Sequence, residues 1–230
     1  MLTVICCRFG TKYSRQYVEV LRNMVSRHLT IPYRFVCLTD DPTPISEVEL
    51  IQFPNQNYAR GWWHKVHLFN PEISLSGLIF YLDLDVVIHK SINCLIEGFE
   101  DRFMGIRDFS RYSCSDWNRL NSSVMLWTAG EHDEIYERFV QDPKTALKMH
   151  GDQDWIWHVA KSKISYWDDN WIQSYKWEMR NREDLIFQNS KRAFKNIGIP
   201  KIHPENCIAV FHGDPNPHEV QDHFVVDNWQ

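Results

Sequence analysis

The chain has 230 residues, of which 43% are hydrophobic and 24% are charged, a balance typical of a soluble globular protein. This length suits one domain with a sizeable core and excludes a disordered or fibrous chain on composition. The formal net charge is -5 and there is no dense run of Lys and Arg, so we expect no nucleic-acid partner.

Neither a membrane span nor a disulfide framework is indicated. No apolar stretch approaches the roughly 20 residues that a membrane helix needs. The run before Arg8 is too short for a signal peptide and lacks a basic start, although contact with a membrane surface stays open. The six cysteines form no C-x-x-C pair, which favours reduced core thiols and a cytoplasmic location over a zinc site.

The first part of the chain is predicted to alternate strands and helices. Strands are expected at Thr3–Cys7, Tyr33–Thr39, Glu49–Phe53 and Gly77–Ile88, and helices from the cap Ser14 to about Leu29 and over Gly61–Phe69. The strands are continuous apolar runs, a pattern typical of parallel strands covered by helices on both faces. Ligands bind beyond the carboxyl ends of such strands, so we expect a site near Arg8–Tyr13, Asp40 and Asp83–Asp85.

The second part of the chain is less regular. Short strands are expected at Val124–Trp127, Trp171–Trp177 and Cys207–Phe211, and helices at Glu131–Val140 and Asp152–Lys161. The chain contains no internal repeat, low-complexity tract or linker. One α/β domain over residues 1–230 is therefore the simplest interpretation, and whether it belongs to a longer protein stays open.

Two carboxylates interrupt the strongest predicted strand, at Asp83 and Asp85. Residues i and i+2 of a strand point to the same side, and two buried carboxylates repel each other unless they bind a cation. Carboxylate oxygens suit Mg²⁺ or Mn²⁺, so the pair predicts a divalent metal site. The alternative is that the strand ends at Asp83 and both groups are solvated, but the apolar run Val86–Ile88 beyond them favours the metal.

A further candidate ligand lies near the C-terminus, in the sequence F-H-G-D-P-N-P (Phe211–Pro217). A neutral imidazole is a good ligand for Mn²⁺, so His212 is the candidate third ligand. Gly213 would let the backbone approach a phosphate closely. The alternative is an ordinary turn with an incidental histidine.

Taken together, these segments resemble glycosyltransferases of the GT-A fold. The nearest group is family 8, with glycogenin and the lipopolysaccharide galactosyltransferases, and related capsular and viral sugar transferases. The matching segments, in the order of the family, are Val4–Tyr13, V-C-L-T-D-D (Val36–Asp41), the helix with Lys65, Y-L-D-L-D (Tyr81–Asp85), N-S-S-V (Asn121–Val124), G-D-Q-D (Gly151–Asp154) and F-H-G-x-P-x-P. The resemblance implies a mostly parallel central sheet flanked by helices. A Rossmann-like half that binds the nucleotide sugar (about 1–90) would precede a half that binds the acceptor and carries the metal loop (about 91–230).

The resemblance also implies an activity. The chain would be a hexosyltransferase that uses Mn²⁺ or Mg²⁺ to move a sugar from a nucleotide-sugar donor, with UDP as the expected nucleotide, to a hydroxyl of a glycan acceptor. Family 8 enzymes retain the anomeric configuration. Two alternatives stay open: a non-catalytic or degenerate carbohydrate-binding protein, and a haloacid-dehalogenase-like phosphotransferase with Asp83 as its nucleophile.

Roles for individual residues follow from the same resemblance. Asp85 and His212 would bind the metal directly, and Asp83 would be shared between the metal and the donor ribose. The other residues expected to contact the donor are Arg8, Phe9 and Tyr13 at the base, Lys65 near the phosphates or the sugar, Gly213 near the phosphates, Asn121 and Ser122 at the sugar, Asp152 and Gln153 at the reacting carbon, and Asp40. Asp152 and Asp154 are also candidate bases if the reaction inverts.

One position departs from the family pattern. Asn216 stands where the family often has a lysine that contacts the diphosphate, and we hypothesise that Lys176 takes this role. Four tryptophans are candidates to stack on an acceptor sugar, with core packing as the commoner role for any one of them: Trp62, Trp63, Trp117 and Trp171.

Overall fold

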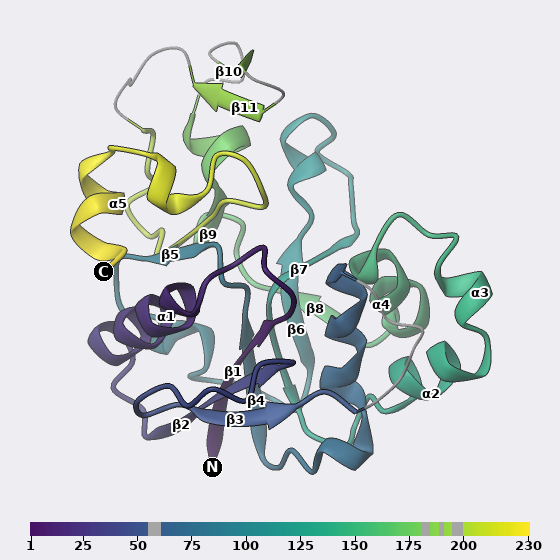
Figure 1. The fold of residues 1–230 in the computed structure, drawn as a ribbon. Helices are drawn as coiled ribbons and strands as arrows, with labels where there is room; N and C mark the ends of the chain where they lie inside the picture. The colour runs from purple at the N-terminus through teal and green to yellow at the C-terminus, as the bar shows by residue number, and fades with distance from the viewer. Residues whose placement is uncertain (55–60, 181–184, 189–190, 195–199) are drawn as a thin grey trace.

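The computed structural model describes residues 1–54, 61–180, 185–188, 191–194 and 200–230, and it is built around a seven-stranded sheet with helices on both faces (Figure 1). The strand order is β3-β2-β1-β4-β7-β6-β8. These strands are β1 (Leu2–Arg8), β2 (Tyr33–Thr39), β3 (Glu49–Gln52), β4 (Leu78–Leu82), β6 (Phe103–Arg107), β7 (Leu120–Thr128) and β8 (Ile164–Tyr166). The first four in the order are parallel, β7 is antiparallel to both of its neighbours, and β6 and β8 are parallel. The predicted α/β fold with a mostly parallel sheet is confirmed.

Helices bury both faces of this sheet, which explains the continuous apolar runs. Leu2, Val4 and Cys6 of β1 face the core formed with α1 (Arg15–His28). Ile5 and Cys7 face the opposite core, which is formed with the 3₁₀ helix Gly61–Phe69, α2 (Glu134–Gln141) and α4 (Asp152–Ala160). Successive side chains of β1 point to opposite faces of the sheet and are apolar on both, as expected for a strand that is covered on both sides.

A smaller sheet corrects one prediction. It contains β5 (Val86–Ile88), β12 (Ile208–Val210) and β9 (Ile172–Ser174), in the order β5-β12-β9. The run Gly77–Ile88 is therefore two strands, β4 in the large sheet and β5 in the small one, and Asp83–Asp85 forms the turn between them. The prediction that the two aspartates point to the same side of one strand is therefore wrong. They lie where the chain crosses from the large sheet to the small one.

Other elements differ in smaller ways. The predicted helix Gly61–Phe69 is present as a 3₁₀ helix, and Val124–Trp127 is part of the longer strand β7. The strands and α-helices that were not predicted are β6, β8, α3 (Pro143–Ala146), α5 (His223–Asn228) and the antiparallel pair β10 (Leu185–Gln188) and β11 (Lys191–Phe194). In β6, Gly105 weakens the strand signal; a Cβ there would lie 2.3 Å from Leu120 Cδ1, so a larger residue would require the buried Leu120 side chain to move.

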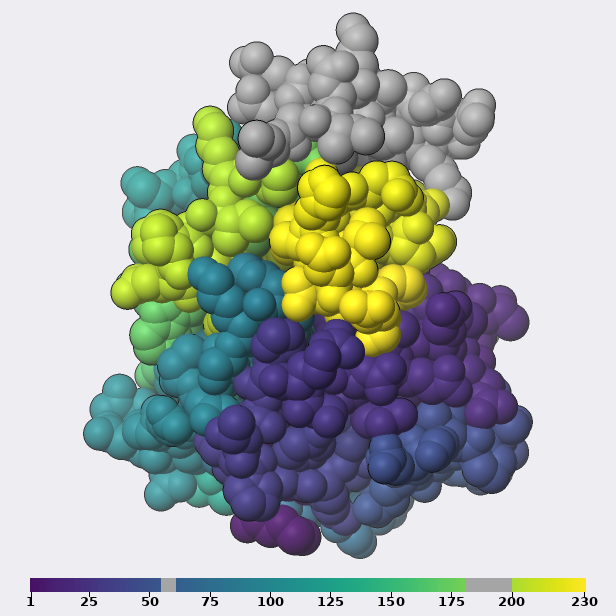
Figure 2. Space-filling view, turned by 90° about the vertical axis from the view of Figure 1, so that its left-hand side faces the viewer, coloured from purple at the N-terminus to yellow at the C-terminus, as the bar shows by residue number. Residues whose placement is uncertain are grey.

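The C-terminal segment packs against the N-terminal half of the chain (Figures 1 and 2). Arg27 donates a hydrogen bond of 3.0 Å to the carbonyl of Gln230, and the rings of Tyr17 and Trp229 meet at 4.9 Å. The backbone N–H of Phe211 bonds to the carbonyl of Asp85 at 3.1 Å. Through these contacts the loop after β12 is brought beside Asp83–Asp85.

All six cysteines are free thiols, but Cys94 and Cys114 are exposed, so the prediction that all are core thiols is wrong for these two. Among the helices of the described residues, none has the length and apolar character needed to cross a bilayer.

Candidate functional site

A cleft of about 910 Å³ opens at the carboxyl ends of β1, β2 and β4. The three segments predicted to border a ligand, which follow these strands, all reach it. The described residues that line it are Cys7, Phe9–Tyr13, Asp40, Gly61, Trp62, His64, Lys65, Tyr81, Asp83–Asp85, Asn121–Ser123, His150–Gln153, His212 and Gly213. The cleft therefore gathers residues from both halves of the chain.

A buried ion cluster forms one wall of the cleft. Lys65 Nζ lies 3.0 Å from Asp83 Oδ1 and 3.4 Å from Asp152 Oδ2. Ser122 accepts a hydrogen bond of 3.0 Å from Lys65 and donates one of 2.7 Å to Asp152. Lys65 and Asp152 are only 7% and 5% exposed, so their charges depend on each other rather than on water.

The charges of this cluster are reflected in its pKa values. Burial lowers the pKa of the Lys65 ammonium, but the carboxylates of Asp152 and Asp83 outweigh it and hold that pKa above its ordinary value. Burial raises the pKa of Asp152, although Lys65 and Ser122 oppose the shift. The ammonium is thus fixed in its charged form at the wall of the cleft.

Asp85 is a buried carboxylate beside this cluster. It accepts hydrogen bonds from the hydroxyl of Tyr13 at 2.9 Å and from the backbone N–H of Gly213 at 3.1 Å. Burial, and then the negative charge of Asp83, raise the pKa of Asp85. Asp83 accepts a hydrogen bond from the hydroxyl of Tyr81 in addition to its contact with Lys65. Two neighbouring carboxylates therefore face one cleft.

The cleft as a whole carries an excess of negative charge. Within the described residues its lining includes four carboxylates, Asp40, Asp83, Asp85 and Asp152, against two lysines, Lys12 and Lys65. A diphosphate would be repelled by this surface unless a cation accompanied it. Carboxylate oxygens are the ligands that hard divalent cations prefer, so the donor set at Asp83 and Asp85 fits Mg²⁺ or Mn²⁺.

His212 lines the same cleft, in a geometry set by its neighbours. Its Nε2 lies 2.6 Å from Ser174 Oγ, and its ring stacks on Phe109 with centroids 5.2 Å apart. In the part of the chain that the structure describes, no three His, Cys, Asp or Glu side chains converge closely enough to hold a metal ion. Asp83, Asp85 and His212 thus line the same cleft, but their side chains are not close enough together to form a metal site. Their role as the three metal ligands stays a prediction.

Most of the other predicted site residues also reach the cleft: Phe9, Tyr13, Asp40, Lys65, Asn121, Ser122, Asp152, Gln153 and Gly213. Three of the predicted residues do not line it. Arg8 instead bonds the carbonyl of Tyr13 at 3.1 Å and pairs with Asp41, so it supports the loop after β1. Asp154 faces Arg119 at 3.8 Å. The buried ammonium of Lys176 donates to the carbonyl of His212 at 2.9 Å, behind the turn.

The structure separates the four tryptophan candidates. Trp62 lines the cleft and is 55% exposed. Trp63 is buried against Phe139, Trp117 bonds Asp108, and Trp171 packs against the core, as expected for structural residues. The cleft residues that sequence reasoning missed include Lys12, His64, Tyr81 and His150. The only feature of the sequence that could have indicated these four residues is that they lie next to, or within, the predicted segments.

Comparison with known proteins shows which solved structures share this fold. No protein-family model matches the chain, and no curated protein matches it. Among solved structures, the glycosyltransferase GlyE of Streptococcus pneumoniae TIGR4 has a TM-score of 0.69 at 12% identity, over 100% of this chain and 62% of GlyE. The galactosyltransferase LgtC, in complex with donor and acceptor sugar analogs, gives 0.61 at 12% identity, over 94% of this chain and 88% of LgtC.

A third similar structure is the apo form of the bifunctional glycosyltransferase WbbM, with a TM-score of 0.63 at 12% identity, over 99% of this chain and 49% of WbbM. The chain thus spans less than two thirds of GlyE and about half of WbbM. At these identities the likeness establishes the fold. The resemblance predicted from the motifs is confirmed at this level: the chain has the GT-A-type α/β fold that these glycosyltransferases share.

Proposed function

We propose that the chain is a metal-dependent glycosyltransferase that moves a hexose-type sugar from a nucleotide-sugar donor to a hydroxyl of a glycan acceptor. UDP is the expected nucleotide, from the resemblance of the motifs. The proposal rests chiefly on one observation: in a fold of the glycosyltransferase type, Asp83 and Asp85 border an acidic cleft large enough for a nucleotide sugar. LgtC has been solved with donor and acceptor sugar analogs, which supports the same use of this cleft.

The residues around the two aspartates suit a diphosphate leaving group. Asp83, Asp85 and His212 would hold a divalent cation, which when bound neutralises charge on the departing diphosphate. Lys65 adds a fixed positive charge at the same wall, because Asp83 and Asp152 keep it protonated and in place. The positive φ of Gly213, 93°, and its backbone N–H bring the main chain close to this region.

Transfer makes a bond between the acceptor oxygen and the anomeric carbon and breaks the bond from that carbon to the diphosphate, which departs with the electron pair; the hydroxyl proton is released. Gln153 is held for contact with the donor sugar, because it bonds Asn121 and Asp108, each at 3.4 Å. The first contact ties the start of α4 to Asn121 in the cleft lining, and the second ties it to the residue before the short helix Phe109–Tyr112, outside that lining.

The geometry favours retention over inversion. An inverting enzyme needs a carboxylate base beside the acceptor hydroxyl. Asp152 is engaged with Lys65 and Ser122, and Asp154 does not line the cleft, so neither predicted base is well placed.

Donor hydrolysis in the presence of Mn²⁺ tests the proposed function. In a panel of nucleotide sugars without acceptor, we expect one UDP-sugar to be hydrolysed, a chelator to stop the reaction, and added Mn²⁺ to restore it. NMR of the first-formed transfer product should show the donor's anomeric configuration. If no nucleotide sugar is bound or cleaved, the proposal fails, and a phosphorylated Asp83 would support the phosphotransferase instead.

Trp62 provides a test of the acceptor side. An exposed indole at the mouth of the cleft can stack on a pyranose ring, and about 1 to 1.5 kcal/mol from such a contact corresponds to roughly a tenfold change. We expect Trp62→Ala to raise the acceptor KM about tenfold, and Trp62→Phe to raise it less. Tyr112→Ala is the matched control, because Tyr112 is exposed outside the cleft lining. An acceptor KM equal in all variants would remove Trp62 from the acceptor site.

A further inference from the structure

The loop that follows β1 forms one edge of the cleft and is fixed by three contacts. The backbone N–H of Gly10, whose φ is 57°, donates a hydrogen bond of 2.8 Å to Asp40. Arg8 donates one of 3.1 Å to the carbonyl of Tyr13, and the hydroxyl of Tyr13 donates one of 2.9 Å to Asp85. These bonds hold the loop beside Asp85, so a side chain carried by the loop has a defined place in the cleft.

Lys12 is carried by this loop, lines the cleft and is exposed. Its ammonium lies 4.6 Å from the centroid of the Tyr13 ring, which it contacts as a cation on an aromatic face. Burial and the charge of Asp83 raise the pKa of Asp85, and the charge of Lys12 opposes this shift, which indicates that the ammonium lies near that carboxylate. Among the described residues, however, Lys12 has no ion-pair partner. Its charge is therefore available to a ligand.

The second lysine of the cleft lining, Lys65, already faces two carboxylates. Its ammonium lies 3.0 Å from Asp83 and 3.4 Å from Asp152. Lys176, which we hypothesised would contact the diphosphate, is 1% exposed and donates to the carbonyl of His212 behind the turn. Lys65 can add to the binding of an anion, but its charge is shared with two carboxylates, and Lys176 does not line the cleft.

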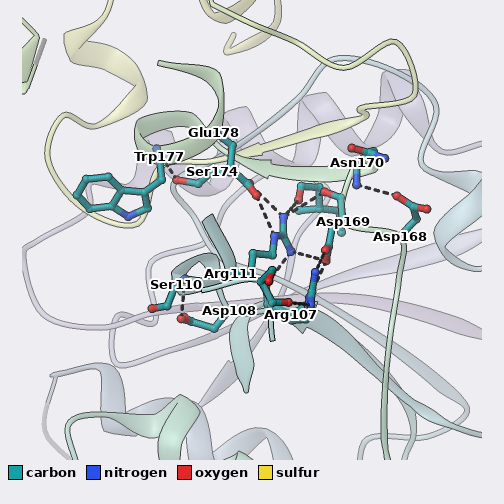
Figure 3. Close-up of polar contacts among 12 residues, drawn as sticks. Arg107, Asp108, Ser110, Arg111, Asp168, Asp169, Asn170, Ser174, Trp177 and Glu178 are labelled. Carbon is teal, nitrogen blue, oxygen red and sulfur yellow. Dashed lines mark hydrogen bonds and ion pairs between the residues drawn. The ribbon is translucent and has the colours of Figure 1, made fainter. Parts of the chain in front are cut away.

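Two arginines, in β6 and in the short helix after it, are also held by carboxylates (Figure 3). Arg111 forms two parallel bonds with Glu178, at 2.9 Å and 3.1 Å, and one of 2.9 Å with Asp169. Arg107 pairs with the same Asp169. Neither arginine lines the cleft. In the described part of the chain, Lys12 is therefore the cation of the cleft lining that no carboxylate pairs.

We propose that Lys12 binds the diphosphate of the nucleotide-sugar donor and so selects nucleotides with a diphosphate over ligands without one. The inference rests on the proposed function. An ammonium has three N–H donors, and contact with one aromatic face leaves donors for phosphate oxygens. The cleft is otherwise acidic, so an unpaired cation near Asp85 lowers the repulsion that a diphosphate meets there. Because the diphosphate gains charge as its bond to the sugar breaks, the same contact favours its departure.

Equilibrium binding of UDP and of uridine, both with Mn²⁺ present, tests this role without turnover. Uridine lacks phosphate, so it reports on the rest of the nucleotide site. In Lys12→Gln, which thermal unfolding should show to be as stable as the parent protein, we expect the Kd for UDP to rise about tenfold and the Kd for uridine to stay the same. Lys12→Arg keeps the charge and should bind UDP nearly as the parent protein does. Lys144→Gln, at an exposed lysine outside the cleft lining, is the matched control and should change neither Kd.

The outcomes separate this role from the proposed function. A parent protein that binds GDP or dTDP instead of UDP is tested with that nucleotide and its nucleoside; if it binds none of the three, the proposed function fails and the role of Lys12 fails with it. If the parent protein binds UDP and Lys12→Gln binds it equally well, the proposed function stands and the role of Lys12 is overturned. An equal loss of affinity for UDP and uridine in Lys12→Gln would also overturn it, because the substitution would then act through the shape of the loop and not through the diphosphate.

Discussion

Replacing Asp85 with asparagine is expected to lower turnover by about three orders of magnitude while leaving the protein folded. The asparagine has the same shape and can still accept a hydrogen bond from Tyr13 or Gly213, but it lacks the charge that would hold a cation. Stabilisation of a departing diphosphate by a metal is worth several kcal/mol, and about 4 kcal/mol corresponds to a thousandfold change in rate.

Although its turnover falls, the same variant should not be less stable to unfolding than the parent protein. Without metal, Asp85→Asn removes a buried carboxylate that lies beside another, so we expect it to be at least as stable as the parent protein. Added Mn²⁺ should raise the melting temperature of the parent protein and not that of the variant, because only a ligand bound to the folded state stabilises it. Asp116→Asn, at an exposed carboxylate outside the cleft lining, is the control. Full activity in Asp85→Asn, or equal stabilisation by Mn²⁺, would contradict the proposed site.

Hydrophobic patterning located most of the large sheet but could not show where the chain changes sheets. The run Gly77–Ile88 is apolar on both sides of the two aspartates because β4 and β5 are both buried, each in its own sheet. The expectation that the aspartates lie at the carboxyl end of a parallel strand is confirmed, because β4 ends at Leu82, whereas the expectation that they lie within one continuous strand is wrong. Short elements such as β6 and α5 were missed because, over five and six residues, their stability comes from packing rather than from local pattern.

The residues of the candidate site also fall into a group that could be predicted from the sequence and a group that could not. Residues adjacent to strand ends were predicted because topology alone brings strand ends together. The partners of those residues were not, since they depend on contacts between distant segments: Arg111 and Glu178 are separated by 67 positions, and Lys65 and Ser122 by 57. Lys176 shows the limit most clearly. Its position near His212 could be inferred, but its burial beneath the turn could not.

Replacing Lys65 with methionine is expected to lower the free energy of unfolding by about 3 to 5 kcal/mol, because removing one partner of a buried ion pair leaves its counter-charges uncompensated. Asp152 is buried and Asp83 is partly buried, and both lose the ammonium that faces them at 3.4 Å and 3.0 Å. Chemical denaturation measures the effect. Lys163→Met is the matched control: Lys163 pairs with Glu134 at 2.7 Å on the surface, where loss of an ion pair should cost less than about 1 kcal/mol.

The double variant Lys65→Met, Asp152→Asn tests whether the stability lost with Lys65 comes from its counter-charges. Neutralising Asp152 removes one of the two uncompensated charges, so we expect part of the lost stability to return and the two sites to show coupling in a double-mutant cycle. Activity is compared only between Lys65→Met and Lys163→Met, because Asp152 is itself expected to contact the donor. A Lys65→Met variant no less stable than Lys163→Met would show that water reaches the cluster. A folded Lys65→Met variant as active as Lys163→Met would show that Lys65 acts on the fold and not on the donor.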